Sequence, residues 1–135
     1  MIALAYPRIA DLIEAAGTPC FVGGPEKNVP LPFCFVWGRL PIGGPVTLSD
    51  ADTYVDREFN VTVAAKAPAD VLVLASQIQQ ALEGAVLEVE GWRVYPLRVV
   101  DSSNVAVDRV VFNEASNTYP ALIVLQVRLQ AIKEM

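Results

Sequence analysis

The densest group of side chains that could carry out chemistry in this sequence is acidic. Asp50, Asp52, Asp56 and Glu58 follow one another closely, in a spacing that superficially resembles a calcium-binding loop. The third ligand position of such a loop would be Tyr54, however, and no glycine follows where its turn requires one. The group could instead form a solvated acidic loop, or a charged surface that faces a partner or a pore. We predict no metal site here.

The residue types that most often perform catalysis are missing. The chain contains no histidine, which removes the commonest general base, the usual activator of a serine nucleophile and the commonest metal ligand. Without histidine, Cys20 and Cys34 cannot form a standard zinc site. Both lie in predicted strands and should be small buried hydrophobic residues with reduced thiols, since a disulfide would require those strands to pair closely. We therefore predict that the protein is not an enzyme and binds no cofactor or metal.

Composition limits the classes of partner. The chain has 15 acidic and 10 basic residues, a formal net charge of −5, and no basic block that could neutralise nucleic-acid phosphates. Hydrophobic residues make up 53% and charged residues 19% of the 135 positions, which predicts that some surface is buried against a partner. No apolar run is long enough to span a membrane, and the first residues lack a signal-peptide pattern. We expect a single cytosolic domain.

Hydrophobic periodicity predicts the central elements. Alternation over residues 58–65 indicates a half-buried strand. A helix should follow over residues 68–83, because Pro68 suits a first helical position and apolar residues recur at three- and four-residue spacing before Gly84. Residues 86–89 and 92–95 alternate around Glu90-Gly91, which predicts a hairpin.

The remaining pattern completes an α+β domain. Residues 7–17 should form a short helix beginning at Pro7, and residues 18–22, 33–37, 105–112 and 118–132 should form strands. Residues 101–104 read as a turn, and Pro120 places the beginning of the last strand at the sheet margin. We expect one mixed, mostly antiparallel sheet covered by one main helix and the short N-terminal helix.

A long connection, residues 39–56, is the most unusual segment. Connections of this length inside a compact domain are usually functional or disordered. This one carries Leu40, Ile42, Val46 and Leu48, which is too apolar for a solvated linker. It could be an extended arm that binds a partner or a flap packed on its own domain.

The order of these elements resembles the tail terminator, or tail completion, proteins of long-tailed (siphophage-type) bacteriophages, together with related small neck proteins. The stretches that carry the resemblance are YVDREFNVTV (54–63), the helix 69–82 with its QIQQAL end, EVEGWRV (88–94) and VLQVRLQ (124–130). Proteins of this family form rings, typically hexameric, that cap the tail tube, stop its polymerisation and join it to the head. The resemblance therefore implies a structural virion protein that assembles in the host cytoplasm.

The resemblance also implies partners and surfaces. The partners would be further copies of the chain, the tail tube protein and a head–tail connector or neck protein, with genomic DNA only as passing cargo and no membrane. Residues that would contact a subunit or partner are Arg39, Leu40, Ile42, Val46, Leu48, Tyr54 and Arg128. Acidic residues that would face the pore are Asp50, Asp52 and Asp56. The apolar excess, the apolar arm, an edge strand able to pair with a neighbour and the acidic balance agree with this implication.

Two alternatives remain open at this stage. The chain could be another head–tail connector or a tail tube subunit. It could also belong to a different class, as a small-ligand binding module or an enzyme with a pocket under the main helix.

Overall fold

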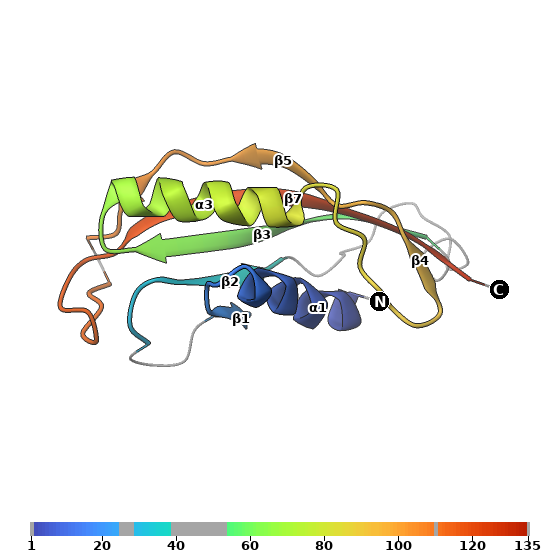
Figure 1. Ribbon diagram of the computed structural model, residues 1–135, viewed down its shortest axis with the longest axis horizontal. Coiled ribbons are helices and arrows are strands. Elements are labelled where there is room, and N and C mark those ends of the chain that lie inside the picture. The colour runs from blue at the N-terminus through green and yellow to red at the C-terminus, as the bar shows by residue number, and fades with distance from the viewer. Residues whose placement is uncertain (1, 25–28, 39–53, 110, 135) are drawn as a thin grey trace.

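The computed structural model describes residues 2–24, 29–38, 54–109 and 111–134 (Figure 1). Along the chain, the helices and strands of this part are α1 (Ile2–Ala15), β1 (Cys20–Val22), β2 (Phe33–Trp37), β3 (Tyr54–Ala65), α3 (Pro68–Leu82), β4 (Trp92–Val94), β5 (Arg98–Ser102), β6 (Ala106–Val107) and β7 (Ala121–Lys133). The predicted α+β class is confirmed.

One mixed sheet organises the molecule, in the order β1-β2-β3-β7, with β4, β5 and β6 paired in turn along the far side of β7. Only β1 and β2 are parallel to each other, and the other described pairs are antiparallel. The two longest strands, β3 and β7, pair over their full shared length, from Tyr54 opposite Ile132 to Ala65 opposite Ala121. Strand β7 therefore has neighbours on both sides, and β3 has β2 on its other side over residues 60–64.

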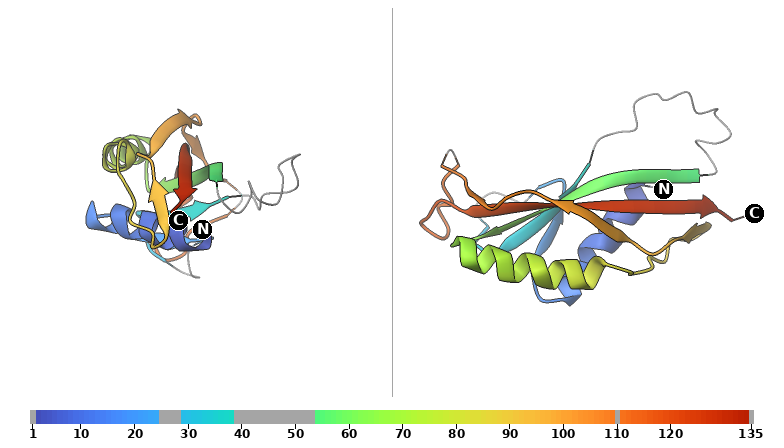
Figure 2. Two further views of the ribbon diagram at one scale, coloured as in Figure 1. Left: turned by 90° about the vertical axis from the view of Figure 1, so that its right-hand side faces the viewer. Right: turned by 90° about the horizontal axis from the view of Figure 1, so that it is seen from above.

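Both helices cover the same face of this sheet (Figure 2). The periodicity of β3 directs Phe59, Val61 and Val63 into the core. There they meet the buried stripe of α3, which includes Val71 and Ile78. We call this side the helix face and the opposite side the helix-free face. Helix α1 lies over β1 and β2 and also contacts α3, so the helix face is covered along most of its width.

The helix α3 follows its predicted signals closely. Pro68 occupies its first turn, and the helix ends at Leu82, with the Glu83 N–H donating to the Gln79 carbonyl at 2.8 Å. Gly84 follows with a φ of 79°, the left-handed conformation that glycine adopts without steric cost.

The predicted start of the first helix is wrong. The sequence placed it at Pro7, but α1 begins at Ile2 and contains Pro7 in its interior. Proline costs a helix the hydrogen bond to the residue four positions earlier. Here that cost falls in the first half of the helix, and Ala5, Ile9 and Ile13 are fully buried. Burial of this apolar stripe extends the helix past the local signal.

The predicted hairpin is wrong in its extent. Gly91 does take a positive φ of 80°, yet residues 86–88 form no strand, and only Val89 and Trp92 bridge across the turn. Strand β4 pairs instead with the end of β7, where Arg93 lies opposite Ile132. The alternation of residues 92–94 was correctly identified, but the pairing partner lies far along the chain.

Three further strand predictions need correction. Residues 98–102, partly assigned to a turn, form β5, whose pairing with β7 shifts between Val99 and Asp101. The strand expected over residues 105–112 shortens to β6. The last strand begins after Pro120, and its first residue Ala121 pairs with both Ala65 and Val107, so it does not start at the sheet margin.

The two cysteines are free and buried, as predicted, although their strands do pair. Cys20 and Cys34 lie opposite each other in the parallel β1–β2 pair, and both are free and buried. A hydrogen bond with Cys20, followed by burial, raises the pKa of Cys34. The thiol form is therefore favoured, which suits a packing role.

Candidate interaction surface

The helix-free face carries a row of hydrogen-bonded polar side chains that we call the polar ladder. It consists of Tyr54, Asp56 and Glu58 on β3 and Gln126, Arg128 and Gln130 on β7. Alternate residues of a strand project to the same side, and facing residues of an antiparallel pair share that side. The same alternation that places Phe59 and Val127 in the core therefore places these six residues on the face that no described helix covers.

The hydrogen bonds of the polar ladder run diagonally between β3 and β7. Gln126 lies opposite Asn60 but donates to Glu58 at 2.6 Å, and Arg128 lies opposite Glu58 but donates to Asp56. The two Arg128 bonds, from Nε and one terminal nitrogen, measure 2.9 and 2.7 Å. At the end of the row, Gln130 Nε2 reaches the Tyr54 hydroxyl at 3.4 Å.

Each β7 side chain thus reaches the β3 residue two positions before its register partner. The strand twist brings such diagonal neighbours within reach of long side chains.

The ion pair controls the charge of Asp56. The hydrogen bonds from Arg128 hold the pKa of Asp56 below its usual value, and the pKa of Arg128 is raised in return. Asp56 is therefore a compensated carboxylate within the ladder. Glu58, in contrast, accepts a hydrogen bond from the neutral amide of Gln126 and is exposed on the helix-free face.

The other end of the helix-free face is apolar. Phe33 and Leu31 pack there with Ala64 in a small second cluster, and Phe21 meets Phe33 edge-to-face at 6.3 Å. Two loops close over this end, because the Leu31 N–H donates to the Ser116 hydroxyl at 2.8 Å and the Asn113 amide donates to the Val29 carbonyl at 2.9 Å. The polar half of the face is the part that these loops leave exposed.

Between the two ends, Trp37 joins β2 to β3. Its indole Nε1 donates to the hydroxyl of Thr62 at 2.8 Å. Thr62 is buried, with a relative exposure of 5%, whereas Trp37 is 37% exposed. A half-exposed indole anchored by a buried hydroxyl is typical of residues that contact partners.

On two outer strands of the sheet, one backbone N–H donates to a carboxylate that lies in a helix or directly after one. On β1, the Cys20 N–H donates to Glu14 of α1 at 3.3 Å. On β5, the Val99 N–H donates to Glu83, just after α3, at 2.6 Å. The backbone of residues 84–85 also bonds to Leu97, with both distances at 2.8 Å.

The outer side of β3 over residues 54–59 has no neighbouring strand among the described residues. Strand β2 pairs only with residues 60–64, so within the described part of the chain these six residues pair with β7 alone. This unpaired side of residues 54–59 we call the open edge of β3.

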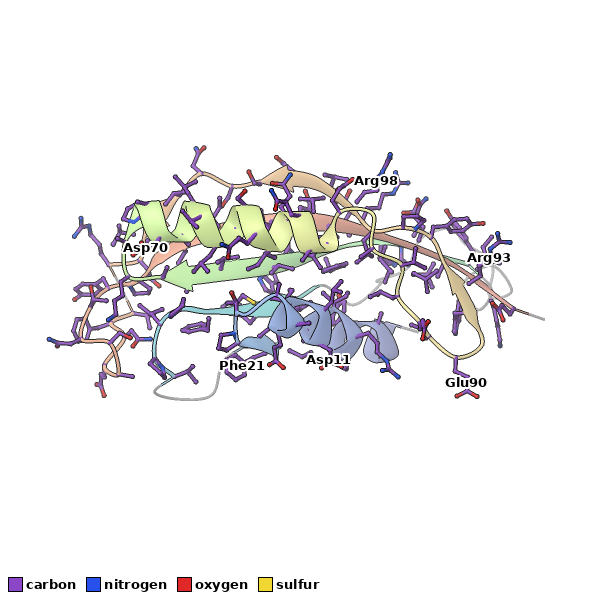
Figure 3. The ribbon with its side chains drawn as sticks, in the orientation of Figure 1. Asp11, Phe21, Asp70, Glu90, Arg93 and Arg98 are labelled. Atoms are coloured by element: carbon purple, nitrogen blue, oxygen red, sulfur yellow. The ribbon has the colours of Figure 1, made fainter. Side chains whose placement is uncertain are left out.

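A shallow cavity of about 600 Å3 lies elsewhere, beside the loop before β4. Its lining includes Arg8, Glu88, Glu90, Arg93 and Glu134. Arg93 and Glu90 project outward there (Figure 3). Small-ligand sites enclose most of their ligand within largely apolar walls, so this hollow gives little support to a ligand-binding role. Among the described residues, no group of three or more side chains is suited to hold a metal ion.

The predicted site residues fall into two groups. Tyr54, Asp56 and Arg128 come together in the polar ladder, and Tyr54 begins β3, so the last three residues of the predicted 39–56 connection belong to a strand. The others lie outside the described residues: Arg39, Leu40, Ile42, Val46, Leu48, Asp50 and Asp52.

Sequence reasoning considered Glu58 only as part of the acidic group, and it missed the contributions of Gln126 and Gln130 to the surface. The alternation of polar residues along the last predicted strand was the signal that could have found them.

Comparison with known proteins gives a fold likeness. No protein-family model and no curated protein matches the chain. Among solved structures, a chain described as "Virion of native gene transfer agent (GTA) particle" is similar, with a TM-score of 0.64 and 18% identity over 97% of this chain and 96% of that one. A second solved chain has a TM-score of 0.57 and 13% identity, covering 96% and 92%. At these identities the likeness shows a shared fold. No described helix is long and apolar enough to cross a membrane.

Proposed function

We propose that this chain is a structural, non-enzymatic protein of a phage-like virion, and more narrowly a tail terminator. In this role, copies of the chain form a ring that caps the tail tube, stops its polymerisation and joins it to the head or neck. The observation that carries the proposal is the fold shared over nearly the whole chain with a component of a gene transfer agent virion. The element order that suggested the terminator family is an independent argument from the sequence.

The exposed surfaces support an assembly role. At the end of the polar ladder, Tyr54 and its register partner Ile132 remain 45% and 40% exposed. A mixture of exposed aromatic, aliphatic and arginine side chains is the composition that subunit interfaces favour. We place Tyr54 and Arg128 in this interface, together with the segment 39–53, whose apolar residues would gain burial only in the assembly.

The acidic residues have a proposed role as well. The chain carries a net charge of −5, and Asp50, Asp52 and Asp56 would face the pore of the ring, with the charge of Asp56 compensated by Arg128. Negative charge along a channel repels DNA phosphates, so the genome could pass without binding. Assembly would take place in the host cytoplasm, with the tail tube protein and a neck protein as partners.

The test is the mass of the purified protein and its effect on tail tubes. Mass photometry should find a closed oligomer, about sixfold heavier than the monomer if the ring is hexameric, and adding it to growing tubes should stop their elongation. A tube subunit would instead form filaments by itself. A protein that stays monomeric at every concentration and leaves tube growth unchanged would exclude the proposal.

Variants of the apolar residues in segment 39–53 sharpen this test. Replacing Leu40, Ile42, Val46 and Leu48 by serine should abolish the ring while leaving thermal unfolding nearly unchanged. A matched control replaces Leu72 and Val73, which are exposed on α3, by serine and should keep the ring. A large loss of stability with an unchanged oligomer would identify the segment as a packed flap.

A further inference from the structure

We infer that an aromatic loop at one end of the molecule inserts into the cavity beside β4 of a second copy of this chain. The loop is formed by residues 111–119, between β6 and β7, and we call it the knob. The cavity is the one of about 600 Å3 described above, and we call it the hollow. This inference rests on the proposed self-assembly and names a contact that would join one copy to the next.

The tip of the knob is held in place by hydrogen bonds. Asn113 and Thr118 exchange two backbone hydrogen bonds, at 2.9 and 3.2 Å, and the Asn113 side chain accepts the Ser116 N–H at 2.8 Å. The amide of the same side chain donates to the Val29 carbonyl at 2.9 Å and so connects the tip to the loop before β2. A loop that is already ordered loses little conformational freedom when it binds a partner.

The knob exposes two aromatic side chains. Phe112 and Tyr119 flank the bridge between Asn113 and Thr118, and their rings pack edge-to-face with centroids 5.1 Å apart. They remain 42% and 41% exposed, and the neighbouring Val111 is 63% exposed. Aromatic side chains that enter a pocket of the partner supply much of the binding energy in protein interfaces. The knob therefore presents an ordered apolar surface that the fold of the single chain does not bury.

The hollow has an apolar lining that matches the knob. Its apolar residues are Val86, Leu87, Val89, Trp92 and Val94. Part of this lining is open to water, because Val86 is 60% exposed and Trp92 is only partly buried. Insertion of the knob would remove apolar surface from water on both sides of the contact, which favours association. A protein loop needs no enclosing walls of the kind that a small ligand requires.

The charged residues of the hollow suit the same occupant. They are two arginines and three glutamates, Arg8, Arg93, Glu88, Glu90 and Glu134. A guanidinium group stacks favourably on an aromatic ring, and a carboxylate can accept a hydrogen bond from the Tyr119 hydroxyl. Glu114, which is exposed at the tip of the knob, adds a carboxylate that either arginine could pair with. The knob thus offers a partner to both charge types in the hollow.

The knob and the hollow of one molecule lie at opposite ends of its long axis. In Figure 1 the knob is the orange-red loop at the left, whereas β4 lies at the right, and the view from above in Figure 2 agrees. The knob can therefore enter only the hollow of another copy. Such a contact is head-to-tail, because each copy uses a different surface on each side. It closes into a ring when the rotation between copies allows closure, and otherwise continues as a filament.

Two complementary variants test this contact. The knob variant carries Phe112→Ser with Tyr119→Ser, and the hollow variant carries Val86→Glu with Arg93→Glu, all at exposed positions. Each variant alone should stay monomeric in sedimentation velocity at concentrations where the wild type assembles. Mixed in equal amounts, the two should form a dimer and nothing larger, because only one intact knob and one intact hollow can combine.

The matched control is Leu72→Ser with Val73→Ser, an exposed apolar pair on α3, which should assemble like the wild type. Thermal unfolding of every variant is compared with that of the wild type first. A knob variant that still forms the full oligomer, or a mixture without dimers, overturns the knob contact and leaves the terminator proposal standing. A wild-type protein that never assembles removes both.

Fluorescence of Trp92 gives a second measurement, in which the knob is unchanged. The chain has two tryptophans, so Trp37→Phe leaves Trp92 as the only one. We expect its emission to shift to shorter wavelength as this protein assembles with rising concentration, because the knob replaces water beside the indole. The same protein without the knob aromatics should show no shift. An emission spectrum that stays constant while the oligomer forms overturns the inference.

Discussion

Arg128 holds Asp56 with two hydrogen bonds, at 2.9 and 2.7 Å, although its register partner across the β3–β7 pair is Glu58. The guanidinium thus binds one carboxylate through both oxygens while a second carboxylate remains beside it. Because the planar fork of arginine matches a carboxylate and the ammonium of lysine does not, this arrangement fixes the direction of both side chains on the helix-free face.

Replacing Arg128 by lysine tests that role. Both side chains of the pair are partly exposed, and exposed ion pairs contribute little to stability. We expect Arg128→Lys to change the urea midpoint no more than Arg93→Lys, an exposed control on β4, while ring assembly weakens. A marked loss of stability with normal assembly would show that the pair serves the fold of the monomer.

The lowered pKa of Asp56 predicts a pH dependence. A carboxyl group whose pKa is lower in the folded state stabilises the fold above its unfolded pKa, about 3.9. That contribution disappears as the pH falls through the lowered folded value. Unfolding free energies measured from pH 6 down to roughly pH 2 should therefore fall less steeply for Asp56→Asn than for the wild type. Asp11→Asn, in α1, is the control, and an identical slope in all three proteins would contradict the prediction.

The bond between Trp37 and Thr62 should contribute measurably to stability. Thr62→Val removes the buried acceptor with little change of shape, and we expect a loss of about 1 kcal/mol. Trp37→Phe removes the donor. If the hydrogen bond carries the effect, the double variant should lose less than the sum of the single variants in chemical denaturation. Strict additivity would indicate that the two residues act independently.

Gly38 has little room for a side chain. A Cβ at this position would overlap the hydroxyl of Tyr6, whose ring packs on Phe59 with centroids 5.7 Å apart. Gly38→Ala should therefore destabilise the protein by roughly 1–3 kcal/mol, as measured by thermal unfolding. Introducing Tyr6→Phe removes the overlapping oxygen and should recover part of that loss. An alanine variant as stable as the wild type would refute the predicted overlap.

Elements whose burial pattern and local signals agree were predictable from the sequence. The alternation around Val61 and the helical stripe of α3 each require one buried face, and the structure provides both on the same core. The polar side chains of the last strand were also visible as a pattern. Their diagonal hydrogen bonds were not, because strand pairing and twist bring Asp56 and Arg128 together from distant parts of the chain.

Predictions of secondary structure failed where a local sequence signal competed with pairing or packing against residues far along the chain. Glu90-Gly91 makes a turn, as predicted, but Arg93 pairs with Ile132 and not across that turn. Strand β5 was obscured because its register shifts near Val100, which interrupts the alternation. Pro7 resembled a helix start, yet burial of Ile9 and its neighbours sustains a helix on both sides of it. None of these partners can be read from a short window of sequence.

The pairing of β3 with β7 also has a consequence for how the chain reaches its fold. Every β3–β7 contact, from Ala65–Ala121 to Tyr54–Ile132, joins residues far apart in sequence, and β4, β5 and β6 depend on the same strand. A nascent chain that has emerged only as far as residue 120 lacks the strand on which half of the sheet is built. High contact order of this kind slows folding, so we expect the core to form late in synthesis, with the apolar side of β3 exposed until β7 arrives.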